Sequence, residues 1–473
     1  MSVTSLAFAG FVLVVLILYY LLPRRAQNNL LLAASYVFLA TWDIRFVVVF
    51  ALLTLVNFAL ARRIAQQGKT GYTVYAGIAF NVAVLLYFKY TGFFITQAAN
   101  LAHTLDLPLN TDSIAIWLPV GLSFFVVQEI SYLLDVYQGI TQPPTDPLHF
   151  ALYMVYFPRM VSGPIERARD LMPQFEQKRI VDSAQIDTSA ALILQGLVRK
   201  IVIADLLFIS MPTNIFDQPR SYTAPELALW LVAYAVALYN DFAGYTLIVR
   251  GVSGLFGIRL VSNFDAPYFA HNFNEFWQRW HISLSNWLRD YSFLPLTRAL
   301  LRRKHIVLAL LLPPLVTMFV SAMWHNLSWN MMLWGALHGC YLVIERLYSR
   351  HRPQTMKSRS MASMLIVFGL VALTWVPFRA SLSATADYWI GLFSPVSWLD
   401  GLTINSVTMA TTVLIGLSFV IDSLHMRIHV VSSIFRKRSK FAKAILIDAA
   451  LIAVILATIL QQGSVPPFVY QGF

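Results

Sequence analysis

The stretch IVLALLLPPLVTMFVSAMWHNLSWNMMLWGALHG, residues 306–339, contains two strongly apolar runs separated by a short polar break. The full runs, 306–324 and 327–348, are each about as long as the ~20 residues that cross a bilayer as a helix. His325 lies in the break, and His338 lies inside the second run. Polar residues at membrane depth cost free energy, so each histidine is a candidate for a functional site.

The two histidines differ in what their surroundings indicate. Gly335 and Gly339 flank His338, which favours a structural role in helix packing, whereas the pattern around His325 leaves a structural and a functional role open. Thirteen residues of helix correspond to about 220° after whole turns, so the two side chains do not share a face. A two-histidine metal site is therefore not expected. Cys340 is the one cysteine, which excludes an intramolecular disulfide and a cysteine-based metal site.

The rest of the chain repeats this apolar pattern. Of its 473 residues, 58% are hydrophobic and 12% are charged, which excludes an ordinary soluble enzyme, a disordered tail and a fibre. We expect an all-α, polytopic transmembrane helical bundle of roughly eleven to thirteen hydrophobic helices, some of them short or re-entrant, in a single membrane domain over residues 1–473. The further apolar runs are 6–22, 29–42, 44–61, 72–95, 115–137, 148–162, 190–212, 225–249, 361–380, 405–424 and 444–461.

The charged residues predict which side of the membrane each loop faces. Lys and Arg number 35 against 23 Asp and Glu, a formal net charge of +12. The clusters of Lys and Arg fall in alternate loops. Residues 96–114, 381–404 and 462–473 contain neither Lys nor Arg. The positive-inside rule places the basic loops, including a cytoplasmic loop at 159–188, in the cytoplasm and both termini outside. This explanation of the charge is plainer than a nucleic-acid partner, and none is expected.

The most polar stretch is NFDAPYFAHNFNEFWQRWHISLSNWLRDY, residues 263–291. It is too polar to span a bilayer, so we expect a re-entrant or interfacial helical segment over 263–296. On a helical wheel, one face collects aromatic and apolar residues, with His281 at its edge. Two interpretations remain open: an interfacial helix with an aromatic belt, or a helix that dips into the protein so that His281 lines a cavity. The residues of the aromatic face are Trp277, Trp280, Leu284, Trp287, Leu288 and Tyr291.

Other polar groups suggest chemistry less strongly. Asn240 and Asp241 lie in an apolar run, where a structural polar network is the favoured interpretation. The chain contains no GxSxG or HExxH motif. Membrane-embedded histidines without paired carboxylates fit general-base catalysis on a hydroxyl. They equally fit a proton-coupled transporter, and composition does not separate the two.

Five blocks of sequence resemble one known family. The chain is similar to bacterial membrane-bound O-acyltransferases of the alginate O-acetyltransferase type, and the string FWQRWHISLSNWLRDY at 276–291 is the most specific part. The blocks are LPVGLSFFVVQEISYLLDVYQG (118–139), YFPRMVSGPIERARDLMPQF (156–175), YNDFAGYTLIVRGVSGLFGIRLVSNFDAPY (239–268), NFNEFWQRWHISLSNWLRDYSFLPL (272–296) and SAMWHNLSWNMMLWGALHG (321–339).

This resemblance implies roles for particular residues. His325 aligns with the family's essential histidine and is expected to act as a general base, and His281 aligns with its second active-site position. Asn326 stands where the bacterial group usually has glycine, so the local pocket geometry is expected to differ. Arg159, Arg167 and Arg169 are expected to attract the phosphates of coenzyme A. The other candidate supporting residues are His338, Trp324, Asn326, Asn240, Asp241, Trp280 and Ser285.

The resemblance also implies a reaction. A helical ring in the bacterial inner membrane would surround a central tunnel, through which an acetyl group from cytoplasmic acetyl-CoA passes towards hydroxyls of an extracytoplasmic polysaccharide. An alginate-like exopolysaccharide is the favoured acceptor, reached directly or through an extracytoplasmic partner acetyltransferase. The alternatives are D-alanyl transfer from a carrier protein to teichoic acid, O-acetylation of peptidoglycan or cellulose, and a polysaccharide or lipid transporter without covalent chemistry. Membrane lipids are expected to surround the protein, and no metal is expected.

Overall fold

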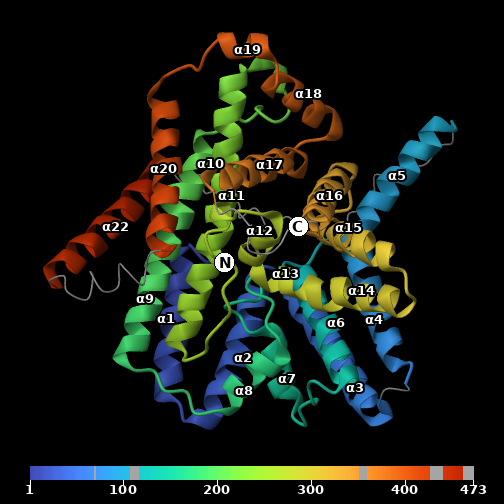
Figure 1. Ribbon diagram of the computed structural model, residues 1–473. Helices are drawn as coiled ribbons and strands as arrows, with labels where there is room; N and C mark the ends of the chain where they lie inside the picture. The colour runs from blue at the N-terminus through green and yellow to red at the C-terminus, as the bar shows by residue number, and fades with distance from the viewer. Residues whose placement is uncertain (69–70, 107–116, 351–359, 427–439, 462–473) are drawn as a thin grey trace. The chain divides into compact units, whose positions relative to one another are not determined.

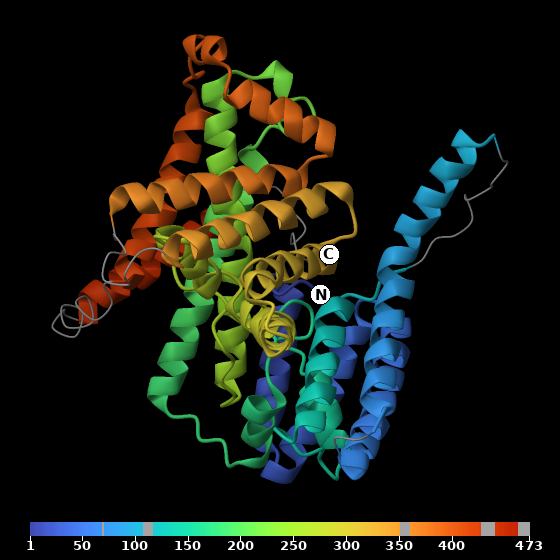
Figure 2. The same ribbon diagram turned by 45° about the vertical axis from the view of Figure 1, so that its right-hand side comes forward.

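The computed structural model describes residues 1–68, 71–106, 117–350, 360–426 and 440–461, and within these ranges the regular elements are all helices. The described chain forms two compact units, and Figures 1 and 2 show their helices from two directions. Unit 1 comprises Met1–Ile193 and Ile248–Val261, and unit 2 comprises Leu194–Leu247 and Ser262–Phe473. The all-α fold expected from the sequence is confirmed.

Unit 1 is built mainly from helices of the first 180 residues. α7 packs against α2, α3 and α8, and α6 packs against α3 and α4. The helices are α1 (Leu6–Leu21), α2 (Arg24–Ala40), α3 (Ile44–Gln67), α4 (Thr73–Leu85), the π-helical turn η2 (Leu86–Tyr90), α5 (Thr91–Thr104), α6 (Leu122–Gln138), α7 (Pro147–Val155) and α8 (Ala168–Glu176).

Two long elements contribute residues to both units. They are α9 (Ser183–Leu197) and α11 (Ala224–Leu255).

Unit 2 contains the remaining helices. α15 and α16 form an antiparallel pair, and α17 packs against α16. The helices are η3 (Val198–Asp205), α10 (Leu206–Ser210), η4 (Pro219–Ser221), η5 (Pro267–Phe269), α12 (Phe273–Arg279), α13 (Ile282–Leu288), η6 (Arg289–Phe293), α14 (Leu294–Arg302), α15 (Ile306–His325), α16 (Trp329–Arg350), α17 (Met361–Arg379), α18 (Leu382–Leu392), α19 (Pro395–Leu399), α20 (Ser406–Met426) and α22 (Lys440–Leu460).

Apolar composition and local caps explain where these helices lie. The Asp43 side chain accepts a hydrogen bond from the backbone N–H of Arg45 and so caps α3. α6 lies between Gly121 and Gly139, whose positive φ angles of 83° and 76° suit glycine. Large apolar side chains remain exposed along the outer helices, for example Leu52 and Leu55 of α3. Such surfaces are unfavourable in water and suit contact with lipid.

Six helices of the described residues are long and apolar enough to cross a membrane. α11 is the most buried of them. In its most apolar 18 residues 83% are buried, against 17% in the corresponding part of Thr73–Thr104. α11 is therefore a core helix, whereas α4 and α5 face outward. The six are Ile44–Gln67, Thr73–Thr104, Ala224–Leu255, Ile306–His325, Met361–Arg379 and Ser406–Met426; Leu6–Leu21 and Ile447–Leu460 are shorter apolar helices.

Three local expectations differ from the structure. The apolar run 148–162 is helical only as far as Val155, because Pro158, Gly163 and Pro164 favour irregular backbone. The expected loop at 96–114 is helical as far as Thr104, where α5 ends, and residues 107–114 of it lie outside the described residues. The aromatic stripe of 277–291 does not lie on one continuous helix, because the backbone kinks at Trp280 and His281.

Candidate active site

A kink between α12 and α13 positions His281. Trp280 has extended backbone angles, and His281 has φ 42° and ψ 55°, in the left-handed region that few side chains adopt. The backbone oxygen of Asn263 accepts the N–H of Ile282 at 2.9 Å, and the Asn263 side chain accepts the N–H of Ser283 at 3.2 Å. Residues held in this conformation store roughly 1–3 kcal/mol and are concentrated at functional sites.

The kink also buries His281, and only 1% of the residue's surface is exposed. Phe242 of α11 contacts the ring edge-on, with ring centroids 4.8 Å apart. The Ser285 hydroxyl donates to the Trp280 carbonyl at 2.9 Å, and the Trp280 indole packs on Trp375 at 4.9 Å. Trp280 and Ser285, both candidates from the sequence, therefore lie where they support the kink.

His325 is the last residue of α15, and α16 begins at Trp329. The expected break between the two apolar runs is present at residues 326–328, one residue later than expected, and His325 is buried at the helix end beside it. Asn326, at the position where the bacterial group usually has glycine, has φ −160°. This extended backbone suits any residue, so asparagine here needs no special conformation.

Tryptophan rings connect the three histidines. The Trp324 indole contacts His281 at 6.0 Å and His325 at 4.8 Å between ring centroids. The Trp334 indole contacts His325 at 5.7 Å and His338 at 4.8 Å. The structure therefore brings all three histidines predicted from the sequence into one buried aromatic cluster in unit 2, which we call the histidine cluster: His281, Trp324, His325, Trp334 and His338.

His338 has a defined hydrogen bond. The Thr374 hydroxyl donates to the Val371 carbonyl at 2.6 Å and lies 2.9 Å from Nε2 of His338, so it accepts from that nitrogen. A Cβ atom at Gly335 would lie 2.8 Å from Cβ of Ala322, which shows how closely α16 approaches α15. These contacts hold His338 between α16 and α17, and its packing role stays a prediction.

The comparisons with known proteins identify the family. The family model of the membrane-bound O-acyltransferases matches residues 31–378, which include every histidine of the cluster. The chain belongs to the membrane-bound O-acyltransferase family. It is therefore an integral membrane acyltransferase, as the sequence indicates.

Individual relatives refine the similarity. The chain is 35% identical to the probable alginate O-acetylase of Azotobacter vinelandii, over 84% of this chain and 79% of the relative. It is 30% identical to the peptidoglycan O-acetyltransferase of Helicobacter pylori, over 76% of this chain and 73% of the relative. Its identity to the teichoic acid D-alanyltransferase of Bacillus subtilis is 27%, over 55% of this chain and 69% of the relative.

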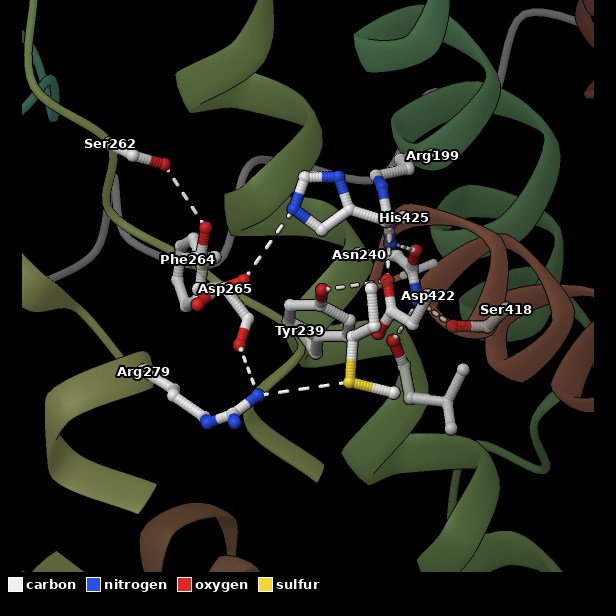
Figure 3. A network of polar contacts seen from close by, with 12 residues as sticks. Arg199, Tyr239, Asn240, Ser262, Phe264, Asp265, Arg279, Ser418, Asp422 and His425 are labelled. Atoms are coloured by element: carbon white, nitrogen blue, oxygen red, sulfur yellow. Dashed lines mark hydrogen bonds and ion pairs between the residues drawn. The ribbon is translucent and has the colours of Figure 1, made fainter. Parts of the chain in front are cut away.

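In this membrane-bound O-acyltransferase, Asn240 and Asp241 belong to a second group of polar residues. Asn240 accepts a hydrogen bond from Arg199 at 2.9 Å and donates to Ser418 at 2.7 Å. Asp241 lies 2.7 Å from the ammonium of Lys200. Figure 3 shows the Arg199 side of this group. The structural polar network favoured by the sequence is present, although its basic members were not anticipated.

The network continues across unit 2. Arg199 forms a buried ion pair with Asp422 of α20, and the Tyr239 hydroxyl donates to the same carboxylate at 3.0 Å. Lys200 also lies 2.5 Å from Asp205, within the same π-helical turn η3. We call Arg199, Lys200, Asp205, Asn240, Asp241 and Asp422 the ionic cluster. In the sequence, the adjacent arginine and lysine inside the apolar run 190–212 are the pattern that indicates this cluster.

The three arginines expected to meet coenzyme A lie in unit 1 and differ in exposure. The Arg159 guanidinium is buried and donates to Gln128 and to the Tyr153 carbonyl. The Arg169 side chain is 53% exposed and lies 3.7 Å from Asp170. Arg167 precedes α8 and is half-buried. Their role in donor binding stays a prediction. No group of three or more metal-ligating side chains occurs among the described residues.

Proposed function

We propose that the protein is an O-acetyltransferase of the bacterial inner membrane, which passes acetyl groups from cytoplasmic acetyl-CoA towards hydroxyls of an extracytoplasmic polysaccharide. The observation that carries this proposal is the contact of His281 and His325 with one indole, Trp324, in a buried site. The similarity to an alginate O-acetylase and to a peptidoglycan O-acetyltransferase supports acetyl as the acyl group. An alginate-like polymer is the proposed acceptor.

The proposed chemistry needs one base and one positioning group. A ring nitrogen of His325 takes the proton of the acceptor hydroxyl as the oxygen attacks the thioester carbonyl carbon. The carbon–oxygen bond forms, the carbon–sulfur bond then breaks, and the proton passes to the leaving thiolate. His281 orients the acceptor or stabilises the charge that develops on the carbonyl oxygen. Burial by tryptophan rings excludes water and so favours transfer over hydrolysis.

The membrane orientation follows from charge. Coenzyme A is anionic and does not cross a bilayer, so the acetyl group must pass through the protein. With the basic loops in the cytoplasm and both termini outside, the break at His325 falls towards the outer side. The acetyl group then reaches the polysaccharide directly or through a partner acetyltransferase outside the membrane.

The donor distinguishes this proposal from its nearest alternative. Purified protein in liposomes should accept label from acetyl-CoA and release free coenzyme A when an alginate-like acceptor is supplied. Label accepted only from a D-alanyl carrier protein would instead support the D-alanyltransferase function carried in the name of the Bacillus relative.

A double variant separates catalysis from transport. His281→Ala combined with His325→Ala should abolish the release of coenzyme A. Unchanged polysaccharide acetylation or export in cells that carry this double variant would favour a transporter without covalent chemistry. The exposed His305, at the opposite end of α15, offers the matched control, because His305→Ala removes a histidine outside the cluster.

A further inference from the structure

Two adjoining cavities lie among α2, α3, α7 and α8 of unit 1. Figure 1 labels these four helices. A polar cavity of about 690 Å³ lies where α2 and α7 begin and α8 ends. An apolar cavity of about 330 Å³ lies between α2, α3 and α7. The Leu148 side chain lines both, so the two cavities meet there. Both volumes fall within the range of small-molecule binding sites, about 300–1,000 Å³.

Positive charge gathers on one side of the polar cavity. Arg24 and Arg25 line it, and both are exposed. The Arg179 guanidinium donates to the side-chain oxygen of Asn28, a residue of the cavity wall, at 2.8 Å. The Arg24 guanidinium donates to the backbone carbonyl of Glu176, which holds it at the cavity wall. α2 has no side-chain cap at its N-terminus, so the helix dipole adds to this potential.

Negative charge lines the same cavity on the α8 side. The Glu176 side chain is 64% exposed, and its carboxylate lies 3.4 Å from Nδ1 of His149. Asp146 accepts the backbone N–H of Leu148 at 2.9 Å and so caps α7. A purely anionic ligand would meet repulsion from these two carboxylates. A ligand that carries a phosphate and an ammonium group matches both signs.

The apolar cavity has the character of a groove for a hydrocarbon chain. Its lining comes from three helices and includes Leu32, Val47 and Phe58. Leu55 and Leu148 on its rim are more than half exposed. In an integral membrane protein such a surface meets acyl chains, whereas a free phosphate ion gains nothing from it.

We propose that the two cavities together bind one zwitterionic phospholipid with a primary amine in its headgroup, of the phosphatidylethanolamine class. Arg24 and Arg25 bind the phosphate, Glu176 accepts hydrogen bonds from the ammonium group, and one acyl chain lies in the apolar cavity past Leu148. The bound lipid would contact α7, α2 and α3 together and stabilise their packing. This site is separate from the histidine cluster, so its test does not depend on acyl transfer.

Native mass spectrometry of the full chain tests the proposal. The protein is released from mixed micelles that contain equal amounts of phosphatidylethanolamine, phosphatidylglycerol and phosphatidylcholine. One phosphatidylethanolamine should remain bound, and Arg24→Gln with Arg25→Gln should reduce that bound fraction at least about tenfold, or about 1.4 kcal/mol. Arg302→Gln with Arg303→Gln, another adjacent and exposed arginine pair, should leave it unchanged.

Two single variants test the two halves of the site. Glu176→Gln should reduce the preference for phosphatidylethanolamine over phosphatidylglycerol, because the amide no longer attracts the ammonium group. Leu148→Trp fills the junction of the cavities from an exposed position and should displace the lipid without unfolding the protein.

Three results would overturn the proposal. They are equal retention of the three lipids by the natural protein, retention unaffected by the Arg24 and Arg25 substitutions, and a rise of the thermal unfolding midpoint with inorganic phosphate equal to that with the lipid. Because binding to the folded state raises the unfolding midpoint, phosphatidylethanolamine should raise it more than either of the other lipids or phosphate does.

Discussion

The histidine cluster and the ionic cluster are both polar groups in apolar surroundings, but they are stabilised differently. In the ionic cluster, Arg199 and Lys200 are matched by carboxylates that the chain itself supplies. In the histidine cluster, tryptophan and phenylalanine rings surround the imidazoles of His281 and His325. Buried charges cost several kcal/mol each unless they are paired, so the first arrangement suits a structural role. Imidazole rings that can exchange protons suit chemistry.

The largest expected effect concerns His325. Removal of a general base typically lowers a rate by ~10²–10⁴-fold. His325→Ala should therefore reduce acetyl transfer from acetyl-CoA by at least about a hundredfold. The measurement is coenzyme A release by purified protein in liposomes, with His305→Ala as the control. Near-normal release of coenzyme A by His325→Ala would contradict a catalytic role for the histidine cluster.

The second effect concerns the ionic cluster. Asp422→Asn keeps the shape of the side chain but leaves the buried Arg199 without its carboxylate partner. Breaking a buried ion pair in this way costs about 3–5 kcal/mol. The thermal unfolding midpoint in detergent should fall clearly, and replacement of both partners, Arg199→Met with Asp422→Leu, should recover most of the loss. If Asp422→Asn unfolds at the natural midpoint, the structural role is wrong.

A buried carboxyl group in unit 1, that of Glu166, should make the folding stability depend on pH. Burial raises the pKa of Glu166 from 4.5 to about 7, although the carboxylate accepts the backbone N–H of Val261. Between about pH 4.5 and 7 the unfolded chain loses this proton before the folded protein does. Folding stability should therefore decrease as pH rises through this window, by up to about 3 kcal/mol, and then level off. Unfolding midpoints at both ends of the window, for natural protein and Glu166→Gln, should show a smaller slope in the variant.

The smallest effect separates His338 from the other two histidines. Thr374→Val removes the oxygen that accepts from Nε2 of His338 but preserves side-chain shape. Stability should decrease by about 1 kcal/mol, the net contribution of one hydrogen bond, and acetyl transfer should change only a few-fold. A hundredfold loss of transfer at unchanged stability would instead place His338 in the chemistry.

Much of the fold follows from the apolar runs. Most of them correspond to helices, because each run is long enough to bury its backbone hydrogen bonds within one segment. Proline and glycine explain the exception at 148–162. The histidines of the cluster could also be singled out: His338 lies inside an apolar run and His325 in the short break between two runs, where polar residues are rare, whereas His281 lies in a polar stretch and was singled out by its place on the aromatic face and by the family resemblance.

One feature of the histidine cluster and one of the ionic cluster were not recognisable from the sequence. The kink at His281 contains no proline or glycine and depends on Asn263, eighteen residues earlier in the chain. The pairing of Arg199 with Asp422 joins residues 223 positions apart, a separation over which periodicity carries no information. Arg199 and Lys200 could have been noted as charges in an apolar run, but their partners are determined by tertiary packing.

The most direct test is the acetyl-transfer rate per folded molecule, measured side by side for His325→Ala and Asp422→Asn. His325→Ala should lose the rate and keep the unfolding midpoint of the natural protein. Asp422→Asn should unfold at lower temperature and keep the rate of the molecules that remain folded. A normal rate in folded His325→Ala, or a rate in folded Asp422→Asn as low as that expected for His325→Ala, would contradict the division of roles between the two clusters.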